Sequence, residues 1–246
     1  MKRIILVLSL VLLLTGCAER LEQAAPTAPP TPVTEQTTPA TEAPTEAPTQ
    51  VPTETPVPPA EPDDGDLVLV TDYIPGIRVE LAYATEHNFT GRTIYEFTEC
   101  YLRYGTVKKL QAACAELETQ GLGVLIWDGF RPVSAQQKLW DICPDPAFVS
   151  DPVTGSRSHC RGSAVDLTLV DLETGAALEM PTGFDDFSAK ADRDYSDCSE
   201  AAAQNARRLE EVMEKCGFRP YSAEWWHFSD VEEYPVDEQF DPTGVG

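Results

Sequence analysis

The sequence predicts an α+β fold in which a mainly antiparallel central sheet is flanked by helices. Two observations lead to this expectation. Strand-like and helix-like segments are mixed along residues 65–246 without the regular alternation that a parallel sheet requires. After a first apolar run, the residues before 65 have almost no large apolar side chains, so the hydrophobic core must lie in the C-terminal part of the chain.

Strands are expected where short apolar runs or alternating patterns occur, at residues 67–70, 77–81, 123–127, 164–170 and 225–228. The first two lie on either side of a turn at Pro75-Gly76. In the segment 164–170, strict alternation places Asp166 and Thr168 on the face opposite Leu167.

Helices are expected at residues 107–120, 133–143 and 199–216. In the first, apolar residues recur three and four positions apart, and Gly121 is a typical stop signal. Pro132 suits the first turn of the second helix. Ser199 is a candidate N-cap for the third, which Gly217 is expected to end.

The N-terminus has the pattern of an exported protein. Lys2 and Arg3 precede an apolar run, residues 4–14, that is too short to span a bilayer but fits the core of a signal peptide. The run ends in Leu-Thr-Gly-Cys17, which resembles the lipobox of bacterial lipoproteins. That resemblance implies a signal peptide at 1–16 and a lipid anchor on Cys17, which would hold the protein on the extracytoplasmic face of the cell membrane. The alternative is an ordinary signal peptide with an incidental cysteine.

Residues 17–64 comprise the anchor cysteine and a tether rich in Pro, Thr, Ala and Glu, which is expected to be disordered and semi-extended. The remaining residues, 65–246, suit one catalytic domain. The formal net charge of −23 argues against nucleic acid as a partner and against adhesion to an anionic membrane surface. The sequence leaves the oligomeric state open.

Six cysteines lie in the domain, and no two form a C-x-x-C pair, which argues against a cysteine zinc site. An even number outside the cytoplasm predicts at least two disulfides, although fifteen pairings are possible and the sequence does not choose among them.

Two of the three histidines lie near a carboxylate. His159 precedes Asp166 by seven residues, and Glu224 precedes His227 by three. Two imidazoles and one carboxylate can hold a zinc ion with a fourth position open to water, and a second carboxylate can accept the proton of that water. Each pair alone is equally consistent with a structural hydrogen bond. In a regular strand, moreover, Glu224 and His227 would point to opposite faces, unless the strand ends or bulges there.

The pattern H-x-x-G-x-A-x-D, followed by E-x-W-H, resembles that of the zinc D,D-peptidases, most closely the D-alanyl-D-alanine dipeptidases of the vancomycin-resistance type. The matching stretches occur in the family's order, at residues 83–91, 127–132, 159–169, 183–187 and 224–228. The resemblance implies the zinc D,D-peptidase (hedgehog-like) fold and one Zn²⁺ per chain.

The resemblance also assigns roles to individual residues. It implies zinc ligands at His159, Asp166 and His227, a general base at Glu224 and an oxyanion-stabilising arginine at Arg131, which could instead form a structural ion pair with Asp128. Asp185 would bind the amino terminus of the substrate, with Asp186 as the alternative, and Tyr83 would line the cleft. His87 is not expected to bind metal.

The sequence departs from the family at Arg157, where close relatives usually have a serine two residues before the first ligand. A shift by one residue would leave Ser156 or Ser158 to bind the substrate carboxylate, and we take Ser158 as the candidate. Alternatively, Arg157 itself could bind that carboxylate through two hydrogen bonds.

The predicted function is therefore zinc-dependent hydrolysis of D-alanyl-D-alanine, or of a related cell-wall peptide, at the cell envelope. One alternative is a D,D-carboxypeptidase that trims peptidoglycan stem peptides. Another is a non-catalytic, zinc-stabilised module that binds the cell wall. The sequence does not reveal whether the purpose is recycling, wall remodelling or resistance.

Overall fold

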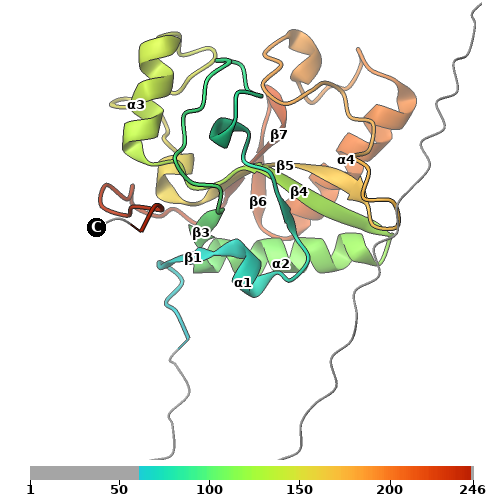
Figure 1. The fold of residues 1–246 in the computed structure, drawn as a ribbon. Helices are drawn as coiled ribbons and strands as arrows, with labels where there is room; N and C mark the ends of the chain where they lie inside the picture. Colours follow the sequence, from blue (N-terminus) through green and yellow to red (C-terminus); the bar gives the residue numbers. More distant parts are fainter. Residues whose placement is uncertain (1–60, 245–246) are drawn as a thin grey trace, which may run out of the picture. The chain divides into compact units, whose positions relative to one another are not determined.

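A five-stranded sheet forms the centre of the protein in a computed structural model that describes residues 61–244 (Figure 1). The strand order is β2 (Arg78–Val79), β4 (Leu122–Asp128), β5 (Ala164–Asp171), β7 (Glu224–Asp230) and β6 (Phe218–Tyr221). Only the β2–β4 pair is parallel, and the other three pairs are antiparallel. The expectation of a mainly antiparallel sheet in an α+β fold is thus confirmed. The predicted signal peptide, Cys17 and most of the tether lie outside the described residues.

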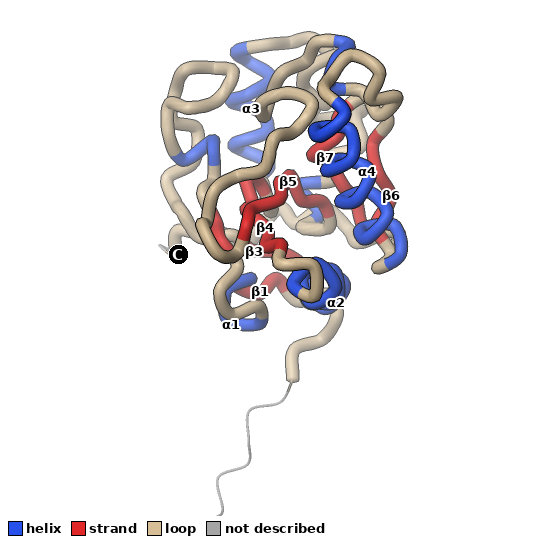
Figure 2. The backbone as a smooth tube through the Cα atoms, turned by 90° about the vertical axis from the view of Figure 1, so that its right-hand side faces the viewer, coloured by secondary structure: helices blue, strands red, loops and turns tan. Residues whose placement is uncertain are grey.

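Three longer helices surround this sheet: α2 (Tyr104–Glu118), α3 (Val133–Ile142) and α4 (Glu200–Lys215). Helices α2 and α4 contact each other, and they pack against β4 and β6, respectively. Helix α3 lies at the opposite end of the molecule from α2 in both views (Figures 1 and 2). No helix among residues 61–244 has both the length and the apolar character needed to cross a bilayer.

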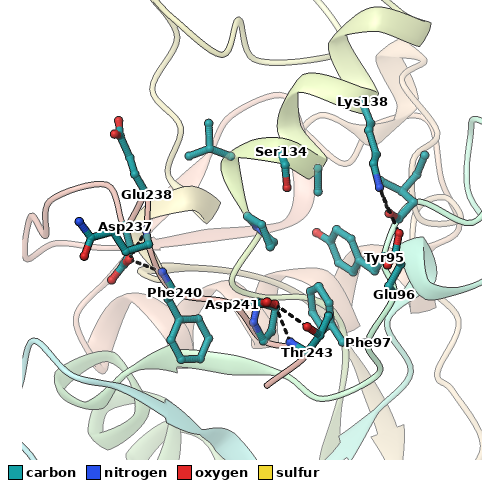
Figure 3. Close-up of a pocket in the computed structure, with 16 residues that line it drawn as sticks. Tyr95, Glu96, Phe97, Ser134, Lys138, Asp237, Glu238, Phe240, Asp241 and Thr243 are labelled. Carbon is teal, nitrogen blue, oxygen red and sulfur yellow. Dashed lines mark hydrogen bonds and ion pairs between the residues drawn. The ribbon is translucent and has the colours of Figure 1, made fainter. Parts of the chain in front are cut away.

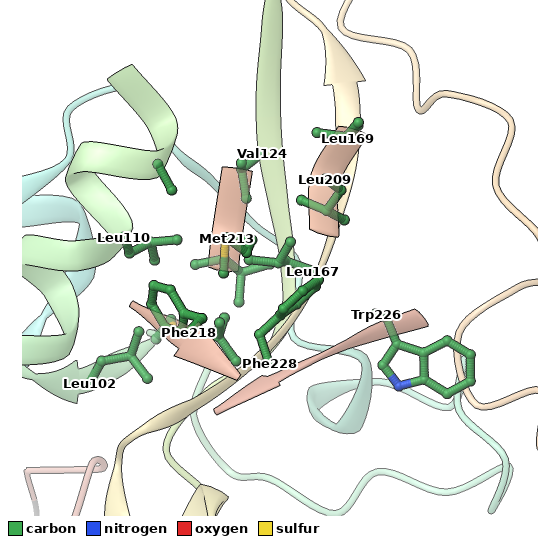
Figure 4. Close-up of a cluster of buried hydrophobic side chains, with 14 of the residues drawn as sticks. Leu102, Leu110, Val124, Leu167, Leu169, Leu209, Met213, Phe218, Trp226 and Phe228 are labelled. Atoms are coloured by element: carbon green, nitrogen blue, oxygen red, sulfur yellow. The ribbon is translucent and has the colours of Figure 1, made fainter. Parts of the chain in front are cut away.

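The core lies between the sheet and the helices α2 and α4. Leu167 and Leu169 of β5 are fully buried in one cluster with Leu110 of α2 and with Leu209 and Met213 of α4 (Figure 4). Because side chains alternate along a strand, Asp166 and Thr168 project from the face of β5 that is turned away from this core. The predicted alternation therefore places Asp166 on the side of the sheet where a site can form.

The helix ends follow from local residue chemistry. The hydroxyl of Ser199 accepts a hydrogen bond from the backbone N–H of Ala202 at 3.1 Å, which confirms the predicted N-cap of α4. Gly121 and Gly217, which follow α2 and α4, have φ angles of 74° and 93°, which side chains rarely tolerate. Pro132 is the N-cap of α3, and the helix begins at Val133 as expected.

Several short elements are not apparent from the sequence. They comprise α1 (Val70–Tyr73), β3 (Tyr101–Arg103), β6, and the 3₁₀ turns η1 (Ala82–Ala84), η2 (His159–Arg161) and η3 (Ala189–Ala191). The strand expected at 67–70 is present as β1 (Leu67–Leu69). Strands β1 and β3 form a separate antiparallel pair. β6 contains Pro220, which normally argues against a strand, but β6 is an edge strand, where a missing N–H leaves no partner unsatisfied.

The expectation of disulfides is wrong for the part of the chain that the structure describes. All six cysteines there are free: Cys100, Cys114, Cys143, Cys160, Cys198 and Cys216. Burial raises the thiol pKa of Cys114 to about 12 and that of Cys160 to about 11, so these residues behave as small apolar core groups. An even number of cysteines in an exported protein does not ensure that any two of them lie close enough to bond. In this fold, no two of the six meet the distances that a disulfide requires.

We therefore expect the denatured, unreduced domain to react with six equivalents of an alkylating reagent. Mass spectrometry of alkylated protein, compared with a sample reduced before alkylation, measures this directly. A smaller mass gain without reduction than after it would show that a disulfide is present.

Candidate metal centre

His159 is presented by a single 3₁₀ turn, η2, that leads into β5. The turn ends at Gly162, whose φ of 69° lies in the left-handed region. A Cβ at this position would come within 2.4 Å of Leu67 Cδ2, so the end of that side chain would have to shift, but the positive φ is the main reason for glycine here. This turn holds the imidazole of His159 in a buried position beside the start of β5.

Asp166 and His227 face each other across neighbouring strands. They are register partners in the antiparallel pair β5–β7, so their side chains project from the same face of the sheet. Asp166 Oδ1 lies 2.9 Å from His227 Nδ1, and Asp166 Oδ2 lies 3.3 Å from His159 Nε2. One carboxylate therefore contacts both imidazoles.

The three side chains together have the geometry of a metal site. One ligand atom from each of His159, Asp166 and His227 lies within 4.8 Å of the other two. The outer nitrogens are held by their own partners: His159 Nδ1 donates to the carbonyl of Gly129 at 2.9 Å, and His227 Nε2 lies 3.1 Å from the Ser229 hydroxyl. A carbonyl can only accept, so a neutral His159 presents an unprotonated Nε2 to the site.

The inner nitrogens of the two histidines, His159 Nε2 and His227 Nδ1, are 3.3 Å apart. With the outer nitrogens protonated, two lone pairs and a carboxylate converge on one point, which is the donor set of a cation site. Burial opposes a charge on Asp166, but His159 and His227 in their protonated forms outweigh it through their charge and their hydrogen bonds, and so lower the pKa of Asp166. Two imidazoles and a carboxylate suit Zn²⁺ better than the hard cations Mg²⁺ and Ca²⁺.

An irregularity in β7 brings Glu224 to the same site. Pro220 of β6 is paired with Phe228, whereas the next residue, Tyr221, is paired with Glu224, so β7 has extra residues between these positions. This break removes the objection that residues three apart in a strand point to opposite faces. Burial raises the pKa of Glu224, and the charges of His227 and Asp166 act on it in opposite directions. Glu224 therefore lies within electrostatic reach of the ligands.

Arg131 is buried and ion-paired. Its Nη2 donates to Asp128 Oδ2 at 2.6 Å, its Nη1 donates to Gln136 at 2.9 Å, and its Cζ lies 5.0 Å from the ring centroid of Tyr83. A bulge in β4 pairs Asp128 with Asp166 across the sheet, which places this ion pair beside the metal ligands. The structural ion pair with Asp128 is thus present, and it positions the guanidinium next to the site.

Of the two neighbouring acidic residues, Asp185 lies near the metal ligands, whereas Asp186 points into solvent. Asp185 accepts hydrogen bonds from the Tyr83 hydroxyl at 3.1 Å and from the Phe89 backbone N–H at 3.4 Å. Burial, together with the charge of Asp166, raises the pKa of Asp185 to about 7. Asp186 is exposed and accepts from the Ser188 backbone instead.

The remaining sequence candidates differ in placement. Ser158 is half-buried and directly precedes His159, and Arg157 beside it has a φ of 49°. Ser156 is exposed. His87 is exposed and lies outside the cluster formed by His159, Asp166 and His227.

Several residues that support the site were not identified from the sequence as its partners. They are Gly129, Ser229, Tyr95 and Gln136. The contact of Ser229 with His227 could have been predicted from the sequence, because residues two apart in a strand share a face and Ser229 follows His227 by two. The contacts of Gly129, Tyr95 and Gln136 depend on how distant segments pack, which the sequence pattern does not show.

A cavity of about 370 Å³ lies beside the metal centre rather than at it (Figure 3). It is lined by the start of α3, by residues 94–97 and by the C-terminal segment 237–243. None of the three metal ligands lines it. Tyr95 is shared, because it lines the cavity and donates a hydrogen bond to Asp128 at 2.7 Å.

This donor set is that of a candidate metal centre, and comparison with known proteins identifies the family as one of metallopeptidases. Residues 63–243 match the family model described as D-ala-D-ala dipeptidase, and residues 1–18 match the model of a prokaryotic membrane lipoprotein lipid attachment site. The chain belongs to the Peptidase M15 D-Ala-D-Ala dipeptidase family, and it carries a lipoprotein lipid attachment site at its N-terminus. The sequence-based assignment of both is confirmed.

Two curated relatives illustrate the similarity. The D-alanyl-D-alanine dipeptidase of Escherichia coli (strain K12) is 37% identical over 176 residues, which cover 71% of this chain and 90% of that protein. The dipeptidase of Enterococcus faecium is 34% identical, covering 69% of this chain and 94% of the relative. Among solved structures, VanYB in complex with D-Alanine-D-Alanine has a TM-score of 0.37 and 17% identity, and covers 54% of this chain and 73% of that chain.

We expect His159→Ala, Asp166→Ala and His227→Ala each to lower the zinc content of the purified protein well below one ion per chain, because each removes a donor. Inductively coupled plasma mass spectrometry measures the content after dialysis against metal-free buffer. His87→Ala, which removes an exposed imidazole, is the matched control and should retain its zinc. Full zinc content in all three ligand variants would show that the metal binds elsewhere.

Proposed function

We propose that this protein is a zinc-dependent D,D-dipeptidase that hydrolyses D-alanyl-D-alanine at the extracytoplasmic face of the cell membrane. The observation that carries the proposal is the convergence of His159, Asp166 and His227, with Glu224 beside them, in a chain of the dipeptidase family. We further propose one Zn²⁺ per chain, the hedgehog-like zinc D,D-peptidase fold, and the division into signal peptide (1–16), tether (17–64) and catalytic domain (65–246).

His159 Nε2, His227 Nδ1 and an Asp166 oxygen would hold the zinc. When bound, the metal would polarise the peptide carbonyl and lower the pKa of the attacking water. The chain's own contribution begins with Glu224. Its carboxylate takes a proton from the water as the water attacks, and then delivers it to the nitrogen of the leaving D-alanine. A pKa raised by burial suits a group that must both accept and release a proton near neutral pH.

Arg131 stabilises the negative charge that develops on the carbonyl oxygen. The residue is only 8% exposed, and the Asp128 carboxylate and the Tyr83 ring fix the position of its guanidinium. A fixed cation in a water-poor site stabilises developing charge without the cost of reorganising solvent. The ion pair with Asp128 is therefore compatible with a catalytic role, since it orients the guanidinium while leaving N–H groups free.

Asp185 binds the free ammonium group of the dipeptide, with Tyr83 as its positioning partner. The carboxylate is largely desolvated, and the charge of Asp166 disfavours its ionisation further. An incoming ammonium group supplies the missing counter-charge. A longer peptide would place a neutral amide there and leave the carboxylate unpaired, which favours the dipeptide as substrate.

The alternative is a D,D-carboxypeptidase acting on stem peptides of the cell wall. The lipid attachment site favours it, because a lipoprotein on a long tether lies close to the wall. The position of Asp185 favours the dipeptide, because a peptide extended at its amino end has no cation to offer.

Glu224→Gln is expected to retain zinc but to lower kcat on D-alanyl-D-alanine by about 10² to 10⁴, the usual range for a positioned acid–base. Released D-alanine, measured by an amino-acid oxidase assay, reports the rate. If Glu224→Gln lost its zinc, Glu224 would be a ligand and Asp166 would lose that assignment.

Unaltered enzyme is expected to cleave D-alanyl-D-alanine much faster than N-acetyl-D-alanyl-D-alanine, and Asp185→Ala should narrow this gap by slowing the free dipeptide. The comparison of kcat/KM for the two substrates measures the effect. Asp186→Ala, which removes an exposed neighbouring carboxylate, is the control and should leave the ratio of kcat/KM for the two substrates unchanged. Equal cleavage of both substrates by the unaltered enzyme would support the carboxypeptidase instead.

A further inference from the structure

Arg193, in the loop between η3 and α4, donates three hydrogen bonds to the hairpin formed by β6 and β7. Its Nε donates to the carbonyl of Tyr221 at 2.8 Å, and its Nη2 donates to the carbonyl of His227 at 2.9 Å. Its backbone N–H donates to the carbonyl of Ser222 at 3.2 Å. Only 8% of the Arg193 side chain is exposed. One buried guanidinium therefore bridges the two strands of the hairpin that carries Glu224.

This bridge lies where the ladder between β6 and β7 is interrupted. Pro220 of β6 is paired with Phe228 of β7. The next pair joins Tyr221 to Glu224, so the three residues of β7 between these pairs have no residue of the described β6 strand opposite them. Pro220 also has no backbone N–H to donate here. Buried carbonyls need a donor from elsewhere when a ladder is broken, and the guanidinium supplies two N–H groups.

The other side of the guanidinium is anchored to α4 and to the core. Its Nη1 donates to the Tyr195 hydroxyl at 3.3 Å and lies 3.5 Å from the carboxylate of Glu210, a residue of α4. Tyr195 in turn donates to Glu210 at 2.6 Å. The Cζ atom of Arg193 lies 4.5 Å from the ring centroid of the buried Phe228. These contacts fix the guanidinium, so it can serve as a rigid support for the hairpin.

Glu224 depends on this support more than His227 does. The β5–β7 ladder fixes His227, because His227 is the register partner of Asp166. Glu224 lies three residues before that pair in the chain, outside the residues of β7 that β5 pairs with. The hairpin therefore sets the position of Glu224. A general base must lie within hydrogen-bond reach of the proton that it takes, and a displacement of about 1 Å can lower the rate by about 100-fold.

We propose that Arg193 is a positioning residue for the general base. By bridging the carbonyls of Tyr221 and His227, it holds the interrupted stretch of β7 so that the carboxylate of Glu224 faces the metal centre. This assignment rests on the proposed dipeptidase function. Because β5 fixes His227 independently, loss of Arg193 impairs proton transfer and spares metal binding.

The test begins with Arg193→Ala in the full, zinc-loaded protein. This variant is expected to keep its zinc and its KM for D-alanyl-D-alanine, but to lower kcat by about 10- to 100-fold. Arg193→Lys keeps the charge without the planar pair of donors and should be intermediate. Arg208→Ala removes the same charge from an exposed position on α4 and should leave kcat unchanged.

A double-mutant cycle with Glu224→Gln separates positioning of the base from general loosening of the fold. Once the base is gone, there is no proton acceptor to position. Arg193→Ala should then lower the remaining kcat by about twofold at most. A merely structural role would lower kcat by the same factor with and without the Glu224 carboxylate.

Zinc content and the melting temperature show whether each variant is folded, and the same cycle is run with Arg193→Lys if Arg193→Ala does not fold. Zinc loss, an unchanged kcat, or equal factors in the two backgrounds would overturn the assignment of Arg193 while the dipeptidase function stood. If the unaltered enzyme did not cleave D-alanyl-D-alanine, the proposed function would fall, and the assignment of Arg193 with it.

Discussion

The pairing of β5 with β7 at Asp166 and His227 is the constraint on which the site depends. Register sets both side chains on the face of the sheet that is turned away from the α2–α4 core. A slip of one residue would turn Asp166 into the core and bring an apolar side chain to the site. The buried Leu167 and Leu169 prevent that slip, because they would then face away from the core. Packing of the core therefore fixes the metal ligands.

Two interruptions of the regular sheet complete the arrangement. The bulge in β4 sets Asp128 beside Asp166, and the irregular stretch of β7 brings Glu224 toward His227. Bulges redirect side chains without changing the strand order, so a standard antiparallel sheet can direct several functional groups at one point. Three carboxylates lie in this region, and their surroundings shift their pKa values in opposite directions. The pKa of Asp166 is lowered, whereas those of Asp185 and Glu224 are raised.

The sequence predicted much of this architecture because its local signals agree with the fold. The alternation in 164–170, the cap at Ser199 and the glycine stops at 121 and 217 each report a local preference that the structure retains. Elements such as β6 were not foreseen, because Pro220 is acceptable only once its strand is known to lie at an edge. The absence of disulfides could not be foreseen either, since pairing depends on distances between segments far apart in the chain.

The candidate ligands came from a motif, but their geometry could not. Nothing in the spacing of His159 and Asp166 indicates that Gly129 holds the imidazole, or that Ser229 holds the partner ring. These contacts select which nitrogen faces the site, and so they decide whether the histidines can bind a metal at all.

Anomalous diffraction at the zinc absorption edge, from crystals of the domain, tests the central claim most directly. The account predicts one zinc peak per chain, bonded to His159 Nε2, His227 Nδ1 and an oxygen of Asp166, with Glu224 beside it and not bonded to it. A peak outside this cluster, a bond through Nε2 of His227, or Glu224 in place of Asp166 would contradict it.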